Sequence, residues 1–405
     1  MTRPEVQVPH RPPHRWCFLC VQIFLSAPSG RSLCYTKRVM YKKILKPLFF
    51  LLPPDAVHNM MVACGKVVQR IAPVRWLLRT LWRRDDPRLS QSLLGIEFRN
   101  PVGLSAGFDK NIELTPLMES VGFGFEIGGS VTMEPRKGNN RPWFYRLPNT
   151  KSIVVYAGMA NVGLVTIKGT IERNQPRLQQ LPLSVSVAVV ANQPAATTEM
   201  IVADVVRAVQ YIVDHKLSQM IEVNISCPNI NGANVFCDPA LLEQLLAAVD
   251  AIEKTQPVFL KMPHLSDTGA LDAMLAVIVR HNVQGLTVAN LVKDRTNVAL
   301  KDELPDTVRG GLSGAPTREH NLAMVRHIYA QHGERLVIIG VGGIFTAADA
   351  YETIKAGASL VAMVTGVIFE GPQVIGKINK GLVRLLEQDG FRSLSEAVGS
   401  EHKKS

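Results

Sequence analysis

The chain has 405 residues, of which 46% are hydrophobic and 20% charged, so it is long enough to bury a large core. Its formal net charge of +11 is concentrated at one end, because residues 1–84 hold fifteen Lys or Arg and only two acids, Glu5 and Asp55. The rest is almost neutral, which argues against an enzyme acting on nucleic acid. Six irregularly spaced cysteines exclude a disulfide framework and are typical of a reducing compartment.

Residues 1–40 are rich in arginine and contain one short apolar run, CFLCVQIFLSA. Its eleven residues are too few to span a bilayer, which takes about 20. We interpret this segment as disordered, as a weak targeting sequence, or as sequence upstream of a start at Met40. Cys17 and Cys20 have no second pair of ligands near them, so no metal site is predicted.

Residues 41–84 are predicted to form two or three short helices, separated at Pro53-Pro54 and at Pro73. Apolar residues recur at steps of three and four along the second of them, which gives one wide apolar face: Val57, Met60, Met61, Cys64, Val67, Val68 and Ile71. Basic residues on the other faces favour an amphipathic segment that lies in a membrane interface. The alternative is a helical subdomain packed on the main body.

From residue 100 onward, eight short apolar runs predict strands at residues 101–106, 124–131, 183–190, 220–225, 257–262, 284–289, 336–341 and 360–364. Helical segments alternate with them, at residues 197–215, 239–255, 266–281, 317–332 and 346–356. This alternation predicts an α/β fold, a (β/α)8 TIM barrel over residues 85–390, with a doubly wound open sheet as the alternative. The long gap after the second strand predicts a hairpin insertion at about 135–165. Residues 391–405 are expected to be a frayed tail.

Loops that follow the strands of a barrel converge on one mouth, so polar residues at the strand ends are candidate site residues. They are Lys110, Ser130, Thr132, Asn224, Cys227, Asn229, Lys261 and Asn290. The glycine-rich stretches GGLSG (310–314), GVGGI (340–344) and TG (365–366) let backbone N–H groups approach an anion. Together they favour a phosphate site over ordinary turns.

Two of these candidates point to redox chemistry on a ring. Lys261 lies in a strand that is otherwise apolar. We therefore favour a buried lysine that stabilises a ring gaining negative charge over a lysine whose side chain reaches out to solvent. Cys227 stands where its strand breaks at Pro228, between Asn224 and Asn229. A thiol with a pKa of about 8.5 can serve as a base, although a small buried hydrophobe is the alternative. The flanking amides favour a planar substrate that carries an imide or a carboxylate.

Six motifs taken together resemble the dihydroorotate dehydrogenase family, over about Tyr41 to Leu382. They are NPVGLSAGFDKN (100–111), GFGFEIGGSVT (122–132), VNISCPN (223–229), GGLSGAP (310–316), IIGVGGI (338–344) and GASLVAMVTGVIFEGP (357–372). The basic helical extension and AGFDKN resemble the membrane-associated, quinone-reducing branch of that family.

The resemblance implies an FMN-binding barrel that oxidises dihydroorotate to orotate in pyrimidine synthesis and passes electrons to a membrane quinone. It implies that Cys227 is the catalytic base that removes the C5 proton. Substrate contacts are implied for Lys110, Asn229 and Asn290. Flavin contacts are implied for Ala106, Gly107, Ser130, Asn224, Lys261, Gly314, Gly342, Gly343, Thr365 and Gly366, and quinone-side positions for His58 and Arg146. It also implies a peripheral membrane protein, on the cytoplasmic face of a bacterial inner membrane or, in a eukaryote, on the mitochondrial inner membrane.

Some positions depart from the pattern of the quinone-linked branch. Cys227 stands where that branch has serine, and apolar residues replace polar ones at Val155, Ala188, Ala289 and Val364. Each lost polar partner could cost about 1–3 kcal/mol where a buried group is left unpaired. Two alternatives therefore stay open: a related FMN barrel that acts on another cyclic amide, or a flavoprotein that binds without turnover. The near-neutral body disfavours a tRNA-dihydrouridine synthase.

Overall fold

The structure is a computed structural model that describes residues 41–190, 196–226, 235–296 and 298–403. The predictions for residues 1–40, for Cys17 and Cys20, and for Cys227 and Asn229 lie outside the described residues. Eight parallel strands close into a barrel in the order β10-β12-β13-β3-β4-β7-β8-β9. The strands, in chain order, are β3 (Val102–Leu104), β4 (Phe125–Val131), β7 (Leu183–Ala188), β8 (Met220–Asn224), β9 (Val258–Lys261), β10 (Gly285–Val288), β12 (Val337–Val341) and β13 (Leu360–Met363). The predicted barrel is confirmed.

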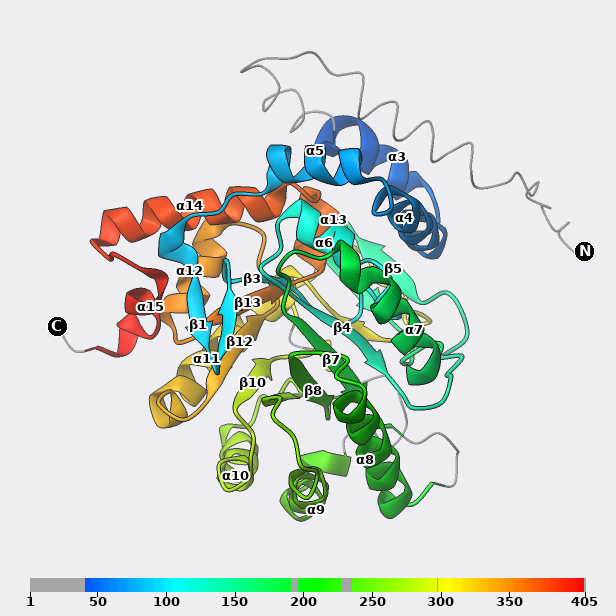
Figure 1. Cartoon of the computed structure of the whole chain (residues 1–405), viewed down its shortest axis with the longest axis vertical. Coiled ribbons are helices and arrows are strands. Elements are labelled where there is room, and N and C mark those ends of the chain that lie inside the picture. Colours follow the sequence, from blue (N-terminus) through cyan, green and yellow to red (C-terminus); the bar gives the residue numbers. More distant parts are fainter. Residues whose placement is uncertain (1–40, 191–195, 227–234, 297, 404–405) are drawn as a thin grey trace, which may run out of the picture.

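Helices surround the barrel (Figure 1). They are α6 (Thr115–Val121), α7 (Leu164–Asn174), α8 (Thr198–Asp214), α9 (Pro239–Asp250), α10 (Thr268–Ile278), α11 (Arg318–His332), α12 (Ala347–Lys355), α13 (Thr365–Glu370) and α14 (Val374–Asp389). Side-chain caps start several of them: Asp238 accepts from the backbone of α9, and Thr346 forms a capping box with Asp349 at α12. The five predicted helices are all present.

The core has an outer and an inner part, because alternate residues of each strand face opposite sides. Along β8, Ile221 and Val223 belong to the large apolar cluster between the strands and the helices. A smaller cluster includes Phe125, Phe259 and Phe98, and the last comes from a short antiparallel hairpin, β1 (Gln91–Leu93) and β2 (Ile96–Phe98). The polar residues that alternate with the outer cluster along β8, Glu222 and Asn224, are therefore turned toward the barrel interior.

The insertion after β4 forms a small sheet of its own. Strands β5 (Phe144–Leu147) and β6 (Ser152–Val155) form an antiparallel hairpin, and β11 (Gly311–Leu312) pairs with β6. The predicted hairpin insertion is confirmed. Because β11 belongs to the loop before α11, this sheet ties two distant loops together on the side of the barrel where the strands end.

The N-terminal helices lie together on one side of the barrel, next to α6, α13 and α14 (Figure 1). They are a short π-helical turn (Tyr41–Leu45), α3 (Lys46–Leu51), α4 (Pro54–Val68) and α5 (Ala72–Trp82). As predicted, the prolines lie at their starts, where a missing backbone N–H costs nothing. None of the helices in the described part of the chain is long and apolar enough to cross a membrane.

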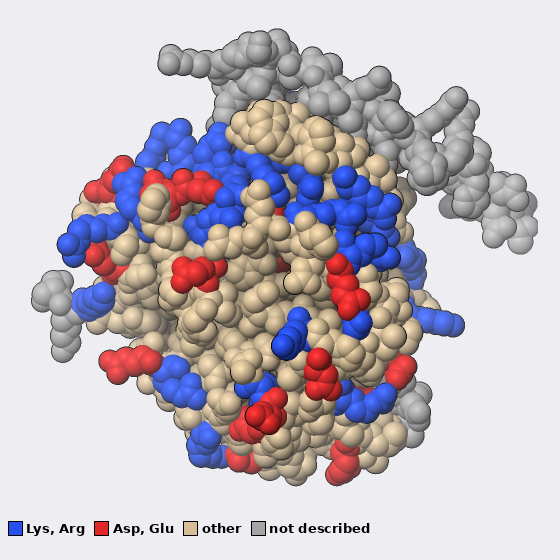
Figure 2. Space-filling view, in the orientation of Figure 1, with Lys and Arg blue, Asp and Glu red and all other residues tan. Residues whose placement is uncertain are grey.

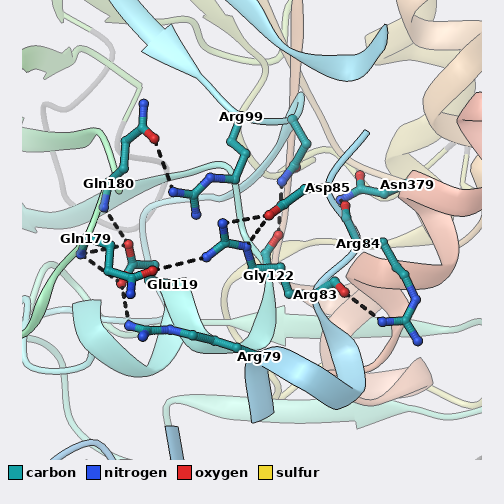
Figure 3. A network of polar contacts seen from close by, with 11 residues as sticks. Arg79, Arg83, Arg84, Asp85, Arg99, Glu119, Gly122, Gln179, Gln180 and Asn379 are labelled. Atoms are coloured by element: carbon teal, nitrogen blue, oxygen red, sulfur yellow. Dashed lines mark hydrogen bonds and ion pairs between the residues drawn. The ribbon is translucent and has the colours of Figure 1, made fainter. Parts of the chain in front are cut away.

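Charged contacts hold α5 against the barrel (Figure 3). The guanidinium of Arg79 donates to Glu119 on α6 at 3.0 Å. Glu119 is fully buried and also accepts from the backbone N–H groups of Gln179 and Gln180, at 2.9 and 2.6 Å. Because the carboxylate is satisfied from both sides, it fixes how α5 sits on the barrel.

The expectation of a frayed C-terminal tail is wrong for most of that segment. Residues 394–397 form α15 (Leu394–Ala397), and a 3-10 turn follows at Ser400–His402. Leu394 and Ala397 are fully buried against the cluster that contains α14. The physical reason is that two apolar side chains three residues apart share one face of a helical turn, a signal too short to be read from sequence.

Candidate active site

One cavity of about 470 Å³ runs from the C-terminal mouth of the barrel to the N-terminal helices. All the predicted substrate, flavin and quinone residues that the structure describes line it: His58, Ala106, Gly107, Lys110, Ser130, Arg146, Asn224, Lys261, Asn290, Gly314, Gly342, Gly343, Thr365 and Gly366. These residues come from the N-terminal helices, from the insertion, and from the ends of most barrel strands. The fold therefore gathers the predicted set into one continuous space.

The barrel end of the cavity has a polar floor. The amide nitrogen of Asn224 donates to the Ser130 hydroxyl at 2.8 Å, and the amide oxygen accepts from the backbone N–H of Ser226 at 3.1 Å. Asn290 donates to the carbonyl and the hydroxyl of Ser226, at 2.6 and 2.8 Å. Lys261 is 5% exposed and pairs in register with Asn224 on the neighbouring strand. Three predicted site residues are thus preorganised by hydrogen bonds and a fourth by strand pairing.

Lys110 stands between this floor and the helical end of the cavity. Its ammonium lies 3.4 Å from Nε2 of His58 and 4.9 Å from the centre of the Phe144 ring. Burial lowers the pKa of Lys110 to about 8, helped by the positive charge of Arg141 and opposed by Asp109 and Asp55. At neutral pH the ammonium form still predominates, so Lys110 offers a partly desolvated cation to an anionic ligand.

Asp109 and Glu126 form a buried carboxyl pair, and Asp109 directly precedes Lys110 in the sequence. Asp109 accepts from the backbone N–H groups of Glu113 and Leu114, at 2.8 and 2.6 Å. Glu126 is fully buried, and burial together with the negative charge of Asp109 raises its pKa. Neither oxygen of Glu126 accepts from a described donor. We therefore assign the proton of the pair to Glu126 and the negative charge to Asp109.

Glycines form a close-fitting cradle on another wall of the cavity. A Cβ added at Gly366 would lie 2.2 Å from the carbonyl oxygen of Ile344, and one at Gly342, whose φ is +104°, would lie 2.3 Å from Oγ1 of Thr317. Asn321 lines the same wall, and its Oδ1 is buried without a hydrogen-bond partner among the described atoms. Backbone without side chains, next to an unsatisfied amide, fits a polar group of the size of a sugar phosphate.

The other end of the cavity is mostly apolar. Side chains of the N-terminal helices and of α6 line it, among them Phe50, Val57, Met60, Leu77, Leu81 and Leu117. His58 packs on Phe108 and Phe144, and burial lowers its pKa to about 3, so its imidazole is neutral. Arg146 donates to the carbonyl of Leu52 at 2.7 Å and lies over the Phe50 ring. This end suits an apolar ligand with few polar groups.

The four unusual apolar positions divide into two kinds. Val155, Ala289 and Val364 line the cavity, so they can contact a ligand that binds there. Ala188 ends β7, is 4% exposed, and packs with Val190 and Met159. It is not among the residues that line the cavity, although it pairs in register with Asn224, which does line it.

Sequence reasoning missed the polar residues behind the floor. Ser186, Glu222 and Thr287 are fully buried in the barrel interior, and the hydroxyls of Ser186 and Thr287 both donate to Glu222. A signal was present, because each occupies an alternate position in a strand whose other positions are apolar. Period-2 alternation marks such residues as facing one side of the sheet. A sequence shows that they share a face but not that they touch.

The chain is similar to known proteins over most of its length. The family model described as dihydroorotate dehydrogenase matches residues 88–386. The chain is 35% identical over 371 residues to a dihydroorotate dehydrogenase (quinone) of Nocardia farcinica, covering 90% of this chain and 98% of that protein. It is 34% identical over 373 residues to the protein of that name from Deinococcus deserti, covering 89% and 100%.

Solved structures share this fold over most of the chain. The ligand-free DHODH of Eimeria tenella is similar with a TM-score of 0.74 and 27% identity, covering 87% of this chain and 100% of that chain. The complex of the Eimeria tenella protein with ferulenol has a TM-score of 0.73 at 27% identity, covering 82% and 94%. From the family match, the relatives and the barrel with its cavity, the chain belongs to the dihydroorotate dehydrogenase family.

Proposed function

We propose that the protein oxidises dihydroorotate to orotate with FMN and passes the electrons to a membrane quinone, as a step of pyrimidine synthesis. The observation that carries the proposal is the single cavity with two unlike ends. Its barrel end offers Lys110, Asn290 and a glycine cradle, and its helical end is apolar. A charged heterocycle and a quinone need these two environments, and a shared flavin between them would connect the two half-reactions.

The cofactor fits the residues present. Gly314, Gly342, Gly343, Thr365 and Gly366 would hold the phosphate, and Ala106, Gly107, Ser130, Asn224 and Lys261 would hold the ring. Bound FMN supplies a hydride acceptor. Lys261 places a cation in the barrel interior, where negative charge on the reduced ring would be stabilised.

The substrate would be held by its carboxylate and its ring amides. We assign the carboxylate to Lys110, whose ammonium is the cation at the polar end, and the ring amides to Asn290 and Asn229. Cys227 would take the C5 proton as general base. In the sequence Cys227 directly follows Ser226, which is hydrogen-bonded to Asn224 and Asn290.

Replacing the thiol tests the base. A general base contributes typically about 10²–10⁴-fold, so Cys227→Ala should slow flavin reduction by that factor in anaerobic stopped flow. Cys227→Ser should slow it less, because a hydroxyl can still take the proton. Cys237→Ala is the matched control, since that thiol is half-buried and does not line the cavity. Equal rates for wild type and Cys227→Ala would refute the assignment.

Peripheral membrane association is supported by the surface of the N-terminal helices. Among the described residues, eight of the twelve exposed large hydrophobic side chains lie between Ile44 and Trp76. Basic side chains gather along the same edge of the molecule, above the neutral body (Figure 2). Apolar side chains flanked by cations match the interface of a bilayer with anionic lipids, and the quinone would enter the cavity from there.

Binding to lipid vesicles tests this surface. Leu51 is 83% exposed, so Leu51→Glu should lower vesicle binding in a flotation assay by about tenfold or more. Met200→Glu, on α8, is the matched control because Met200 is exposed far from these helices in the sequence. Unchanged binding of Leu51→Glu would refute the assignment of this face.

A second candidate function is oxidation of a less polar cyclic amide. It is favoured by Val155, Ala289 and Val364, which line the cavity where the family has polar residues. Anaerobic reduction of the flavin by a panel of dihydropyrimidines separates the two. Dihydroorotate should reduce it fastest, and faster reduction by a substrate without a carboxylate would favour the second function.

A further inference from the structure

A chain of hydrogen bonds runs through the barrel interior behind the proposed flavin site. It begins at Asn290 and passes through Ser226, Asn224, Ser130 and Ser186 to Glu222. The successive distances are 2.8 Å, 2.8 Å, 2.8 Å, 2.7 Å and 2.7 Å. Every member except Asn290 is less than one-tenth exposed. Because these side chains are buried, most of their donors and acceptors must satisfy one another.

Groups that can only donate or only accept fix the direction of this chain at one end. The backbone N–H of Ser226 can only donate, and it donates to the amide oxygen of Asn224 at 3.1 Å. The amide nitrogen of Asn224 must therefore face Ser130. In the same way, the backbone carbonyl of Ser226 can only accept, and it accepts from the amide nitrogen of Asn290 at 2.6 Å.

The carboxylate of Glu222 fixes the direction at the other end. Its two oxygens accept from Ser186 and from Thr287, each at 2.7 Å. Because the Ser186 hydroxyl donates its only hydrogen to Glu222, it must accept from Ser130. The Ser130 hydroxyl thus accepts from Asn224 and donates to Ser186. Both ends require the same orientation, and all donors point toward Glu222.

We propose that Glu222 is a positioning residue which, as the final acceptor of this chain, directs the Ser130 hydrogen to Ser186 and so holds the Ser130 hydroxyl as an acceptor toward the bound flavin, while the backbone N–H of Ser226 holds Asn224 as a donor. The proposal rests on the proposed FMN site. With its hydrogen committed to Ser186, the Ser130 hydroxyl can offer only a lone pair, so it selects an N–H or a hydroxyl group of the cofactor. The second amide hydrogen of Asn224 selects a carbonyl oxygen or a ring nitrogen.

Two matched substitutions test the proposal, because Glu222 has two hydroxyl partners. Ser186→Ala removes the partner that leads to Ser130, whereas Thr287→Val removes the one that is outside the chain. FMN affinity of the apoprotein is measured by quenching of flavin fluorescence. We expect Ser186→Ala to weaken FMN binding by about tenfold and Thr287→Val to weaken it by less than about twofold.

A double-mutant cycle shows whether Ser186 acts through Ser130. In a Ser130→Ala background, the further substitution Ser186→Ala should have no additional effect on FMN affinity. In the Ser186→Ala single variant, the Ser130 hydroxyl is free to donate to the flavin, so the visible absorbance band of the bound flavin should shift. In Thr287→Val the band should stay in place. A purely structural role for Ser186 would not move the band.

Equal losses for Ser186→Ala and Thr287→Val, or additive effects in the cycle, would overturn the proposal. If Ser186→Ala does not fold, Glu222→Gln replaces it. The amide oxygen of glutamine can still accept from Ser186 while its nitrogen turns to Thr287, so affinity should stay within about threefold, and a larger loss would count against the proposal. If the wild-type apoprotein fails to bind FMN, the proposed cofactor falls instead.

Discussion

Substitution of Lys110 tests the assignment of the substrate carboxylate. Lys110→Met keeps most of the apolar length of the side chain but removes the ammonium, and with it the contact of Nζ with the Phe144 ring. A hydrogen bond to a charged group contributes about 1.5–3 kcal/mol, which corresponds to roughly 10- to 100-fold in affinity. We therefore expect Lys110→Met to raise the Kd for orotate by about that factor, measured by titration of the flavin absorbance.

The pH dependence of orotate binding gives a sharper test. Burial lowers the pKa of Lys110 to about 8, so the free protein loses this positive charge as the pH rises through about 8. Orotate keeps its negative charge over this range and prefers the ammonium form. Its affinity should be constant below that pH and fall by up to about tenfold per unit above it.

Lys254 supplies a matched control. Burial also lowers the pKa of Lys254, but its ammonium donates to the carbonyls of Val249 and Ile252 and does not line the cavity. Lys254→Met should keep the affinity and its pH dependence, whereas Lys110→Met should lose the decline above pH about 8. The same decline in Lys110→Met as in the wild type would refute the assignment.

Three further predictions follow from the cavity and the buried acid. Val57→Trp should fill the apolar end of the cavity and slow quinone reduction, but it should not slow anaerobic flavin reduction by the substrate. Asn59→Trp is the control, because Asn59 is exposed and its substitution should change neither rate. Loss of both half-reactions in Val57→Trp would contradict the assignment of the two reactions to separate ends of the cavity. Gly366→Ala should weaken FMN retention in gel filtration, because its Cβ would meet the Ile344 carbonyl, whereas Gly169→Ala has open space and should retain FMN. The raised pKa of Glu126 adds stability below the ordinary glutamate pKa, and this is lost as pH rises toward the raised pKa. The Tm of wild type should therefore fall relative to Glu126→Gln as the pH rises above about 4, and a constant difference would refute the proton assignment.

The barrel could be predicted because its signals are local and repeated. Each strand is a short apolar run. Each predicted helix comes after such a run and shows the helical period of apolar residues instead of the alternation of a strand. The site residues could be predicted because strands in such a barrel end at one mouth, so Lys110, Asn224 and Lys261 had to meet. The C-terminal turn at Leu394 was missed because its signal is one helical turn long.

Contacts inside the barrel could not be predicted from the sequence. Ser186, Glu222 and Thr287 come from three strands, and their contacts depend on the stagger of those strands. That register is set by the whole sheet and not by the residues next to each one.

In the proposed function, the two ends of the cavity meet at a flavin that dihydroorotate can reduce. The most direct measurement is the visible absorbance of the purified holoprotein when dihydroorotate is added without oxygen. The account predicts that the yellow band bleaches and that added quinone restores it. Protein that stays yellow under saturating dihydroorotate, while a chemical reductant still bleaches it, would contradict the account.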